Sequence, residues 1–212
     1  MQWMLVIPVK PLARAKSRLS DTAADALRPG LALAFAQDTV AAALACPAVK
    51  DVAVVTHDPW AGRELGALGA HIVSDEPYGG LNTALAHAAA AVRATRPESA
   101  VAALNADLPA LRPLELARVL DAAAEFPRAF LPDAAAIGTT LLAAREGAEL
   151  RPAFGPDSRA RHRASGAVEL TLDTVDSVRQ DVDTGADLRA ALALGVGPRT
   201  AAQAARLLIP GQ

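Results

Sequence analysis

Short apolar runs alternate with longer amphipathic segments along most of the 212-residue chain. Apolar runs bounded by turn residues predict buried strands, and segments with a helical period predict helices. The predicted strands are residues 3–9, 52–56, 71–73, 101–104, 129–132, 140–144 and 178–182. The predicted helices are 23–45 with a break near Pro29-Gly30, 81–93, 113–125, 186–194, a short one within the loop 154–166, and a peripheral one from Thr200.

Strands that alternate with helices indicate an α/β protein with a mostly parallel sheet and helices on both faces, a Rossmann-like arrangement. The length fits a single domain over residues 1–212, and neither an internal repeat nor a linker divides it. In such sheets ligands bind outside the carboxyl ends of the strands. Three segments that follow strands therefore become candidates for the site: residues 10–18, 56–58 and 105–109.

The composition narrows the class of protein. Hydrophobic residues make up 52% of the chain but aromatic residues only 3%, so we expect a core of Ala, Leu and Val. A net charge of −2 gives no electrostatic footprint for nucleic acid or an anionic membrane. The apolar runs are too short for a membrane span, and the start lacks the basic region of a signal peptide. Cys46 is the single cysteine, which excludes disulfide scaffolds, and we expect a cytoplasmic protein.

A cationic loop directly follows the first predicted strand. It contains Lys10, Arg14, Lys16 and Arg18, and two prolines restrict its freedom. Lysine recurs elsewhere only at Lys50, while all other cations are arginines, so the loop lysines suggest a need for compact point charges. Such a loop at a strand end suits the oxygens of a triphosphate, although a solvated basic turn is the alternative.

Paired glycines precede the predicted helix 81–93. Gly79 and Gly80 allow the backbone to approach a ligand closely, and Asn82 is placed to hydrogen-bond a base or ribose. A simple turn between strand and helix explains the same residues equally well.

Asp107 lies just beyond the predicted strand 101–104, in the string N-A-D-L-P. A carboxylate there is a natural ligand for Mg²⁺, which takes one or two carboxylates and completes its octahedron with phosphates and water. The alternative is a helix cap, but Pro113 lies too far along the chain for Asp107 to cap its helix.

Polar groups of the second half suit the phosphate of a small acceptor. Hydroxyl groups and glycines occur in G-T-T-L-L (138–142) and in P-A-F-G-P-D-S (152–158). Asp181 and Asp183 alternate in the predicted strand 178–182 and just beyond it, so we expect at most one of them to share the metal of Asp107. Helix capping is an alternative for Asp183, and His162 fits a surface, packing or functional role.

Five strings, in order, resemble the CofC/FbiD guanylyltransferases of coenzyme F-420 biosynthesis. They are I-P-V-K-P-L-A-R-A-K-S-R-L-S, N-A-D-L-P-A-L, G-T-T-L-L, F-G-P-D-S-R-A-R-H and D-V-D-T-G-A-D-L. The resemblance implies a glycosyltransferase-A-type nucleotidyltransferase fold, with a nucleotide-binding N-terminal half and an acceptor-binding C-terminal half. It implies transfer of GMP from GTP to a three-carbon phosphoacid, with release of pyrophosphate. The Arg- and Ala-rich composition is similar to that of actinobacterial members, for which the resemblance implies phosphoenolpyruvate as acceptor, giving enolpyruvoyl-2-diphospho-5'-guanosine, rather than 2-phospho-L-lactate.

The resemblance also assigns residues. The acceptor-binding positions fall on Thr140, Gly155 and Ser158, with Thr139 as the neighbour of the first. Mg²⁺ falls to Asp107 and Asp183. We expect the nucleotide to be bound by Lys10, Lys16, Ser17, Arg18, Gly80 and Asn82. Two departures stand out: Asn105-Ala106-Asp107 replaces an Asp-x-Asp, and Thr139-Thr140 replaces a Thr-Asn pair of archaeal-type members.

Two other functions remain open at this point. A nucleotidyltransferase for another acceptor, such as a sugar phosphate or phosphoglycerate, would keep the metal site and change the region from Thr140 to Ser158. A non-catalytic nucleotide-binding protein would keep the sheet without the metal, against which Asp107 and Lys16 both argue. The expected partners are therefore GTP and phosphoenolpyruvate, with hand-over of the product to the downstream F-420 pathway transferase as a further possibility.

Overall fold

Strand β1 (Trp3–Pro8), in the interior of the sheet, is buried on both of its faces. The computed structural model describes residues 1–14, 19, 27–74 and 79–207. The odd-numbered side chains of β1 from Trp3 to Ile7 pack into one apolar cluster, whereas Met4 and Val6 pack into another. Because successive side chains of a strand point to opposite faces, the two clusters are the cores on either side of the sheet.

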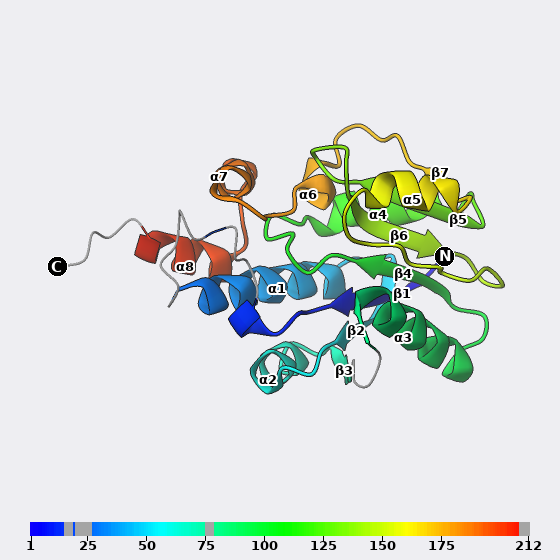
Figure 1. The fold of residues 1–212 in the computed structure, drawn as a ribbon, viewed down its shortest axis with the longest axis horizontal. Coiled ribbons are helices and arrows are strands. Elements are labelled where there is room, and N and C mark those ends of the chain that lie inside the picture. The colour runs from blue at the N-terminus through cyan, green and yellow to red at the C-terminus, as the bar shows by residue number, and fades with distance from the viewer. Residues whose placement is uncertain (15–18, 20–26, 75–78, 208–212) are drawn as a thin grey trace.

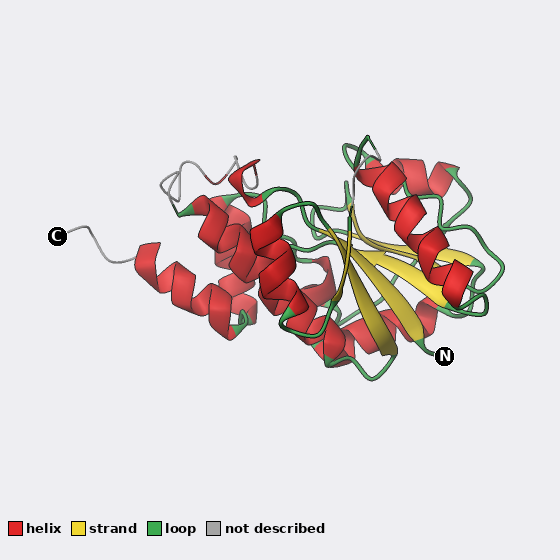
Figure 2. Cartoon of the chain, turned by 90° about the horizontal axis from the view of Figure 1, so that it is seen from below, coloured by secondary structure: helices red, strands yellow, loops and turns green. Residues whose placement is uncertain are grey.

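The described strands form one mixed sheet (Figure 2). Their order is β3-β2-β1-β4-β6-β5-β7. Neighbouring strands are parallel except at β6, which runs antiparallel to both β4 and β5. A mostly parallel sheet is thus confirmed. Besides β1, the strands are β2 (Val49–Val55), β3 (His71–Val73), β4 (Ala100–Leu104), β5 (Arg128–Pro132), β6 (Thr139–Ala144) and β7 (Val168–Glu169).

Helices cover both faces of the sheet, as predicted (Figures 1 and 2). Apolar side chains of α1, α2 and α4 join the cluster of Trp3, and those of α3 join the cluster of Met4. A third, smaller cluster lies between α1 and α7. The helices are the 3-10 helix η1 (Leu12–Arg14), α1 (Arg28–Leu44), α2 (Pro59–Gly66), α3 (Leu81–Thr95), α4 (Pro113–Ala123), α5 (Ser158–Ala164), α6 (Asp176–Arg179), α7 (Gly185–Leu194) and α8 (Pro198–Leu207).

One predicted strand is wrong. Residues 178–182 are the end of α6 followed by irregular chain, because the place beside β5 in the sheet is taken by β7. Two hydrogen bonds hold α6 beside α4 instead, one with a side chain of α4 and one with the main chain of the residue before that helix. Glu115 accepts a hydrogen bond from the Ser177 N–H at 2.9 Å, and the Ser177 hydroxyl accepts one from the Arg112 N–H at 3.0 Å.

Four elements were not predicted: η1, α2, α6 and β7. Strand β7 has two residues, too few for a pattern. Helix α2 begins at Pro59, and the Asp58 side chain accepts hydrogen bonds from the N–H groups of Trp60 and Ala61. An aspartate followed by proline is a recognisable helix start, so the signal for α2 was present in the sequence. For the predicted helix 23–45, the described part begins at Arg28 and has Pro29 in its first turn.

Candidate active site

A cavity of about 590 Å³ opens where β1 and β4 end and where β6 begins. Loops from both halves of the chain contribute to its wall. Its polar lining comes from the segments after β1 and β4, the β5–β6 turn, the loop before α5 and the segment before α7. The lining includes Lys10, Asn105, Asp107, Asp133, Gly138, Thr139, Gly155, Asp157, Ser158, Asp181 and Asp183.

The loop after β1 is anchored at its start by Asp58. The carboxylate of Asp58 accepts a hydrogen bond from the Leu12 N–H at 2.8 Å while it caps α2. Burial acts to raise the pKa of Asp58, but the N–H groups of Leu12, Ala61 and Trp60 outweigh it and lower the pKa. Lys10 lines the cavity. Lys16, Ser17 and Arg18 lie outside the described residues.

The loop that carries Asp107 is fixed from two sides. The hydroxyl of Thr39, on α1, accepts from the Leu108 N–H at 3.0 Å and lies 3.1 Å from the Ala106 carbonyl oxygen. The Asp107 carbonyl accepts from the Val182 N–H at 3.1 Å. The residue that caps α4 is Arg112, so Asp107 does not cap that helix. Its side chain lies at the cavity instead.

The expectation that Asp181 and Asp183 face opposite ways is wrong. It assumed a strand, whereas this segment is irregular, and both aspartates line the cavity. The predicted alternative for Asp183 was helix capping, but the cap of α7 is Thr184, which forms a capping box with Asp187. Asp107, Asp181 and Asp183 are therefore brought to one cavity. Among the described residues, no group of three or more His, Cys, Asp or Glu is arranged to hold a metal.

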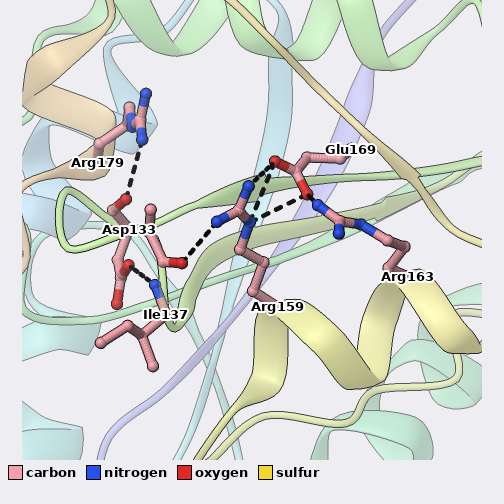
Figure 3. Close-up of polar contacts among 7 residues, drawn as sticks. Asp133, Ile137, Arg159, Arg163, Glu169 and Arg179 are labelled. Carbon is pink, nitrogen blue, oxygen red and sulfur yellow. Dashed lines mark hydrogen bonds and ion pairs between the residues drawn. The ribbon is translucent and has the colours of Figure 1, made fainter.

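The turn between β5 and β6 is organised by Asp133, which sequence analysis missed (Figure 3). Its carboxylate accepts from the N–H groups of Ile137 at 2.9 Å and Gly138 at 2.8 Å. A Cβ atom at Gly138 would overlap that carboxylate, so the close approach requires glycine. An aspartate that opens a short connection between two strands is a usual turn signal, and it could have been recognised.

Two arginines hold the outer side of this turn (Figure 3). Arg179 donates to the Asp133 carbonyl at 3.1 Å, and Arg159 donates to the Ala136 carbonyl at 2.7 Å. Glu169, on β7, fixes Arg159 through a 2.7 Å ion pair and also pairs with Arg163. The hydrogen bond from Arg159 is the main cause that lowers the pKa of Glu169. The network keeps the turn, and with it Gly138 and Thr139, against the cavity.

The loop before α5 and the first residue of that helix bring Gly155 and Ser158, respectively, to the cavity. Gly155 has a φ of +114°, which favours glycine. Asn82, on α3, holds this loop: its amide donates to the Phe154 carbonyl at 3.0 Å and accepts from the Phe154 N–H at 2.8 Å. Asn82 and Gly80 do not line the cavity, whereas their neighbour Leu81 does. The Asn82 amide is thus engaged with the loop.

The two threonines of β6 differ in position. Thr139 is 3% exposed and lines the cavity, whereas Thr140 is fully buried and is not part of the lining. In the described part of the chain, the Thr140 hydroxyl has no hydrogen-bond partner. A role of Thr140 in acceptor binding therefore stays a prediction, and Thr139 is the residue placed to contact a ligand.

Comparison with solved structures places the fold among the nucleotidyltransferases. A putative nucleotide-diphospho-sugar transferase from Desulfovibrio desulfuricans G20 superimposes with a TM-score of 0.61 at 17% identity, covering 92% of this chain and 97% of that chain. A 4-diphosphocytidyl-2C-methyl-D-erythritol synthase gives 0.62 at 12% identity, covering 91% and 98%. The predicted nucleotidyltransferase fold is confirmed.

No helix in the described ranges has the length and apolar character needed to cross a membrane.

The family follows from the sequence comparison. The model of the family described as "Guanylyl transferase CofC like" matches residues 3–205. A phosphoenolpyruvate guanylyltransferase from Streptomyces avermitilis is 83% identical over 211 residues, covering 100% of this chain and 98% of that protein. One of the same name from Streptomyces coelicolor is 82% identical and covers both chains completely. The chain belongs to the CofC family of guanylyl transferases, which confirms the resemblance found in the sequence.

Proposed function

We propose that the protein transfers the guanylyl group of GTP to phosphoenolpyruvate and releases pyrophosphate. One observation carries the proposal: one cavity gathers a lysine from the loop after β1, aspartates that include those after β4 and before α7, and hydroxyl and glycine groups at the starts of β6 and α5. These are the groups that two phosphate-bearing substrates need. The relatives from Streptomyces, 83% and 82% identical, are named for this reaction.

The reaction is an in-line displacement at the α-phosphorus of GTP. An oxygen of the acceptor phosphate forms the new bond to that phosphorus, and the bond to the bridging oxygen of the pyrophosphate breaks. The acceptor phosphate is ionised at neutral pH, so the step requires neither a general base nor a covalent enzyme intermediate. Catalysis then consists of alignment and of neutralising charge on the phosphates.

We assign the two substrates to the two halves of the cavity. Lys10, together with Lys16, Ser17 and Arg18 of the same loop, binds the triphosphate. Thr139, Gly155 and Ser158 bind the acceptor phosphate. Because the Asp133 turn and the Asn82 contact fix these groups before any ligand arrives, little order has to be imposed on binding.

We propose that two aspartates of the cavity bind a hard divalent cation together with the substrate phosphates, which supply its further oxygen ligands. Mg²⁺ prefers oxygen ligands and uses one or two carboxylates beside phosphate and water. Asp107 and Asp183 would hold it, and Asp181 lines the same cavity. When bound, the ion supplies positive charge to the phosphate oxygens. An aspartate from the segment before α7 would then take the place of the first carboxylate of an Asp-x-Asp, which this chain lacks.

We propose that the reaction belongs to coenzyme F-420 biosynthesis, the pathway of the guanylyltransferases that the sequence resembles. The product is an activated diester that joins guanosine to a three-carbon acid, and it suits a downstream transferase that expels GMP. Hand-over to that transferase, and action in the cytoplasm, are parts of the proposal.

The test is pyrophosphate release with Mg²⁺ over a grid of substrates. GTP, ATP and CTP are each paired with phosphoenolpyruvate, 2-phospho-L-lactate and 3-phosphoglycerate, and the products are weighed by mass spectrometry. We expect the pair GTP and phosphoenolpyruvate to give the highest kcat/KM and the mass of the guanylylated acid. Turnover of another acceptor at a higher kcat/KM, or release of pyrophosphate without an acceptor, would refute the proposal.

A further inference from the structure

His162, whose role the sequence left open, lies behind the cavity wall and contacts the cavity-lining Thr139. The ring is fully buried on α5. It packs edge-on against Phe154, with ring centroids 5.0 Å apart, and lies 5.7 Å from the Phe130 centroid. A surface role is therefore excluded, and the two ring nitrogens have to satisfy their hydrogen bonds within the protein.

Both nitrogens do so, and their partners fix the tautomer. Nε2 lies 2.9 Å from the Ala153 main-chain N–H, a group that can only donate. Nε2 must therefore carry a lone pair, and the hydrogen of the neutral ring must sit on Nδ1. Nδ1 lies 2.9 Å from the Thr139 hydroxyl oxygen, so the ring donates to that oxygen.

The direction of this bond decides what Thr139 offers to a ligand. A hydroxyl that accepts from histidine keeps its own hydrogen to donate elsewhere. In the described part of the chain, His162 is the hydrogen-bond partner found for Thr139 Oγ1. Since Thr139 lines the cavity, that hydrogen is available to a bound group. With the opposite tautomer, Thr139 would donate to the ring and turn a lone pair toward the ligand.

We propose that His162 is a positioning residue that sets the Thr139 hydroxyl as a hydrogen-bond donor to the phosphate of the acceptor. An anion needs donors, and a lone pair at this place would repel it. The same ring holds Ala153, next to the Phe154 that Asn82 holds, so it also fixes the loop that carries Gly155. The inference rests on the proposed function for the identity of the ligand but not for the tautomer.

The tautomer is tested on the native full-length protein. Long-range ¹H–¹⁵N NMR spectra at pH 7.5 distinguish protonated from unprotonated ring nitrogens, and the His162 signals are those lost in His162→Asn. We expect a protonated Nδ1 and an unprotonated Nε2. The reverse pattern would overturn the proposal whatever reaction the protein catalyses.

The role toward the acceptor is tested by a double-mutant cycle, with the KM values of phosphoenolpyruvate and GTP as readouts. Thr139→Val removes the hydroxyl and should raise the acceptor KM about tenfold, while Thr139→Ser should remain within about twofold of native. His162→Gln keeps a hydrogen-bond acceptor for the Ala153 N–H but lacks the donor at Nδ1. It should raise the KM of phosphoenolpyruvate about fivefold on its own and less than about twofold in the Thr139→Val background. His162→Asn, which keeps a donor near Nδ1, should have the smaller effect of the two His162 substitutions. In all variants the GTP KM should stay within about twofold.

The outcomes separate this inference from the proposed function. An equal rise in acceptor KM in both backgrounds means that His162 acts through packing, which overturns the positioning role. If the native protein shows no turnover of phosphoenolpyruvate with GTP, the proposed function fails. The cycle is then read from calorimetric binding of inorganic phosphate, with the same pattern expected. If His162→Gln does not unfold cooperatively, the Thr139→Val and Thr139→Ser pair and the native tautomer decide.

Discussion

The main-chain N–H of Val182 donates to the carbonyl oxygen of Asp107 at 3.1 Å. This bond joins the loop after β4 to the segment before α7, two segments that are far apart in the sequence. Val182 is fully buried in the small cluster beside α1, so the join is held by packing as well. As a result, the carboxylates of Asp107, Asp181 and Asp183 share one cavity.

Substitution of Asp107 by asparagine tests the proposed metal ligand. Asp107→Asn keeps the shape of the side chain and both main-chain contacts of the loop, so the free energy of unfolding should change by less than about 1 kcal/mol. The kcat with Mg²⁺ should fall at least about a hundredfold, because charge stabilisation of the phosphates is lost. Asp173→Asn, at an exposed position outside the cavity lining, is the matched control. A near-native kcat in Asp107→Asn would contradict the assignment.

Removal of the Ser158 hydroxyl tests the acceptor side. Ser158 is 2% exposed and lines the cavity beside Gly155. A phosphate that loses one charge-assisted hydrogen bond should bind more weakly by roughly 1.5–3 kcal/mol. Ser158→Ala should therefore raise the KM of phosphoenolpyruvate about ten- to a hundredfold and leave the KM of GTP nearly unchanged. Ser99→Ala, just before β4 and outside the cavity lining, serves as control. A selective loss of GTP affinity would reverse the two half-sites.

Substitution of Asn82 distinguishes two roles for its side chain. Sequence analysis assigned the side chain to nucleotide binding, whereas in the structure it is hydrogen-bonded to the main chain of Phe154, in the loop that carries Gly155. If the structural contact is the important one, Asn82→Ala loosens the loop that carries Gly155. The KM of phosphoenolpyruvate should then rise about tenfold, while that of GTP changes less than about twofold. Steady-state kinetics with each substrate varied in turn measures both. A rise confined to GTP would support contact with base or ribose.

The pH dependence of stability should report His162. Burial first, and the charges of Arg128 and Arg161 second, lower its pKa from the usual 6.5 to about 4. Between these values the unfolded chain binds more protons than the folded protein, so stability rises with pH. The contribution of His162 is fully present above about pH 6.5 and is lost as the pH falls through about 4, in total roughly 3 kcal/mol.

Urea unfolding of the native protein and of His162→Asn, from pH 7.5 to pH 4.5, measures this contribution. The native protein should lose stability more steeply than the variant below pH 6.5, whatever the difference between them at pH 7.5. Parallel curves would mean that the pKa of His162 is not lowered.

The local signals in the sequence were sufficient for most of the fold. The runs that became β1 and β4 are apolar on both faces, a pattern that favours a sheet covered by helices. The rule that ligands bind at carboxyl ends of strands also directed attention to Lys10 and Asp107, and both line the cavity. The strings before and within α5 marked Gly155 and Ser158.

What the tertiary structure decided depends on contacts between distant segments. Residues 178–182 have a strand-like pattern, but β7 occupies the sheet edge beside β5, and Glu115 and Arg112 hold α6 in its place. That change turned Asp181 toward the same cavity as Asp183. Likewise, neither the pairing of Asn82 with Phe154 nor that of His162 with Thr139 leaves a periodic signal. Hydrogen-bond partners of buried polar groups are fixed by the packing of the whole chain, which a local pattern does not contain.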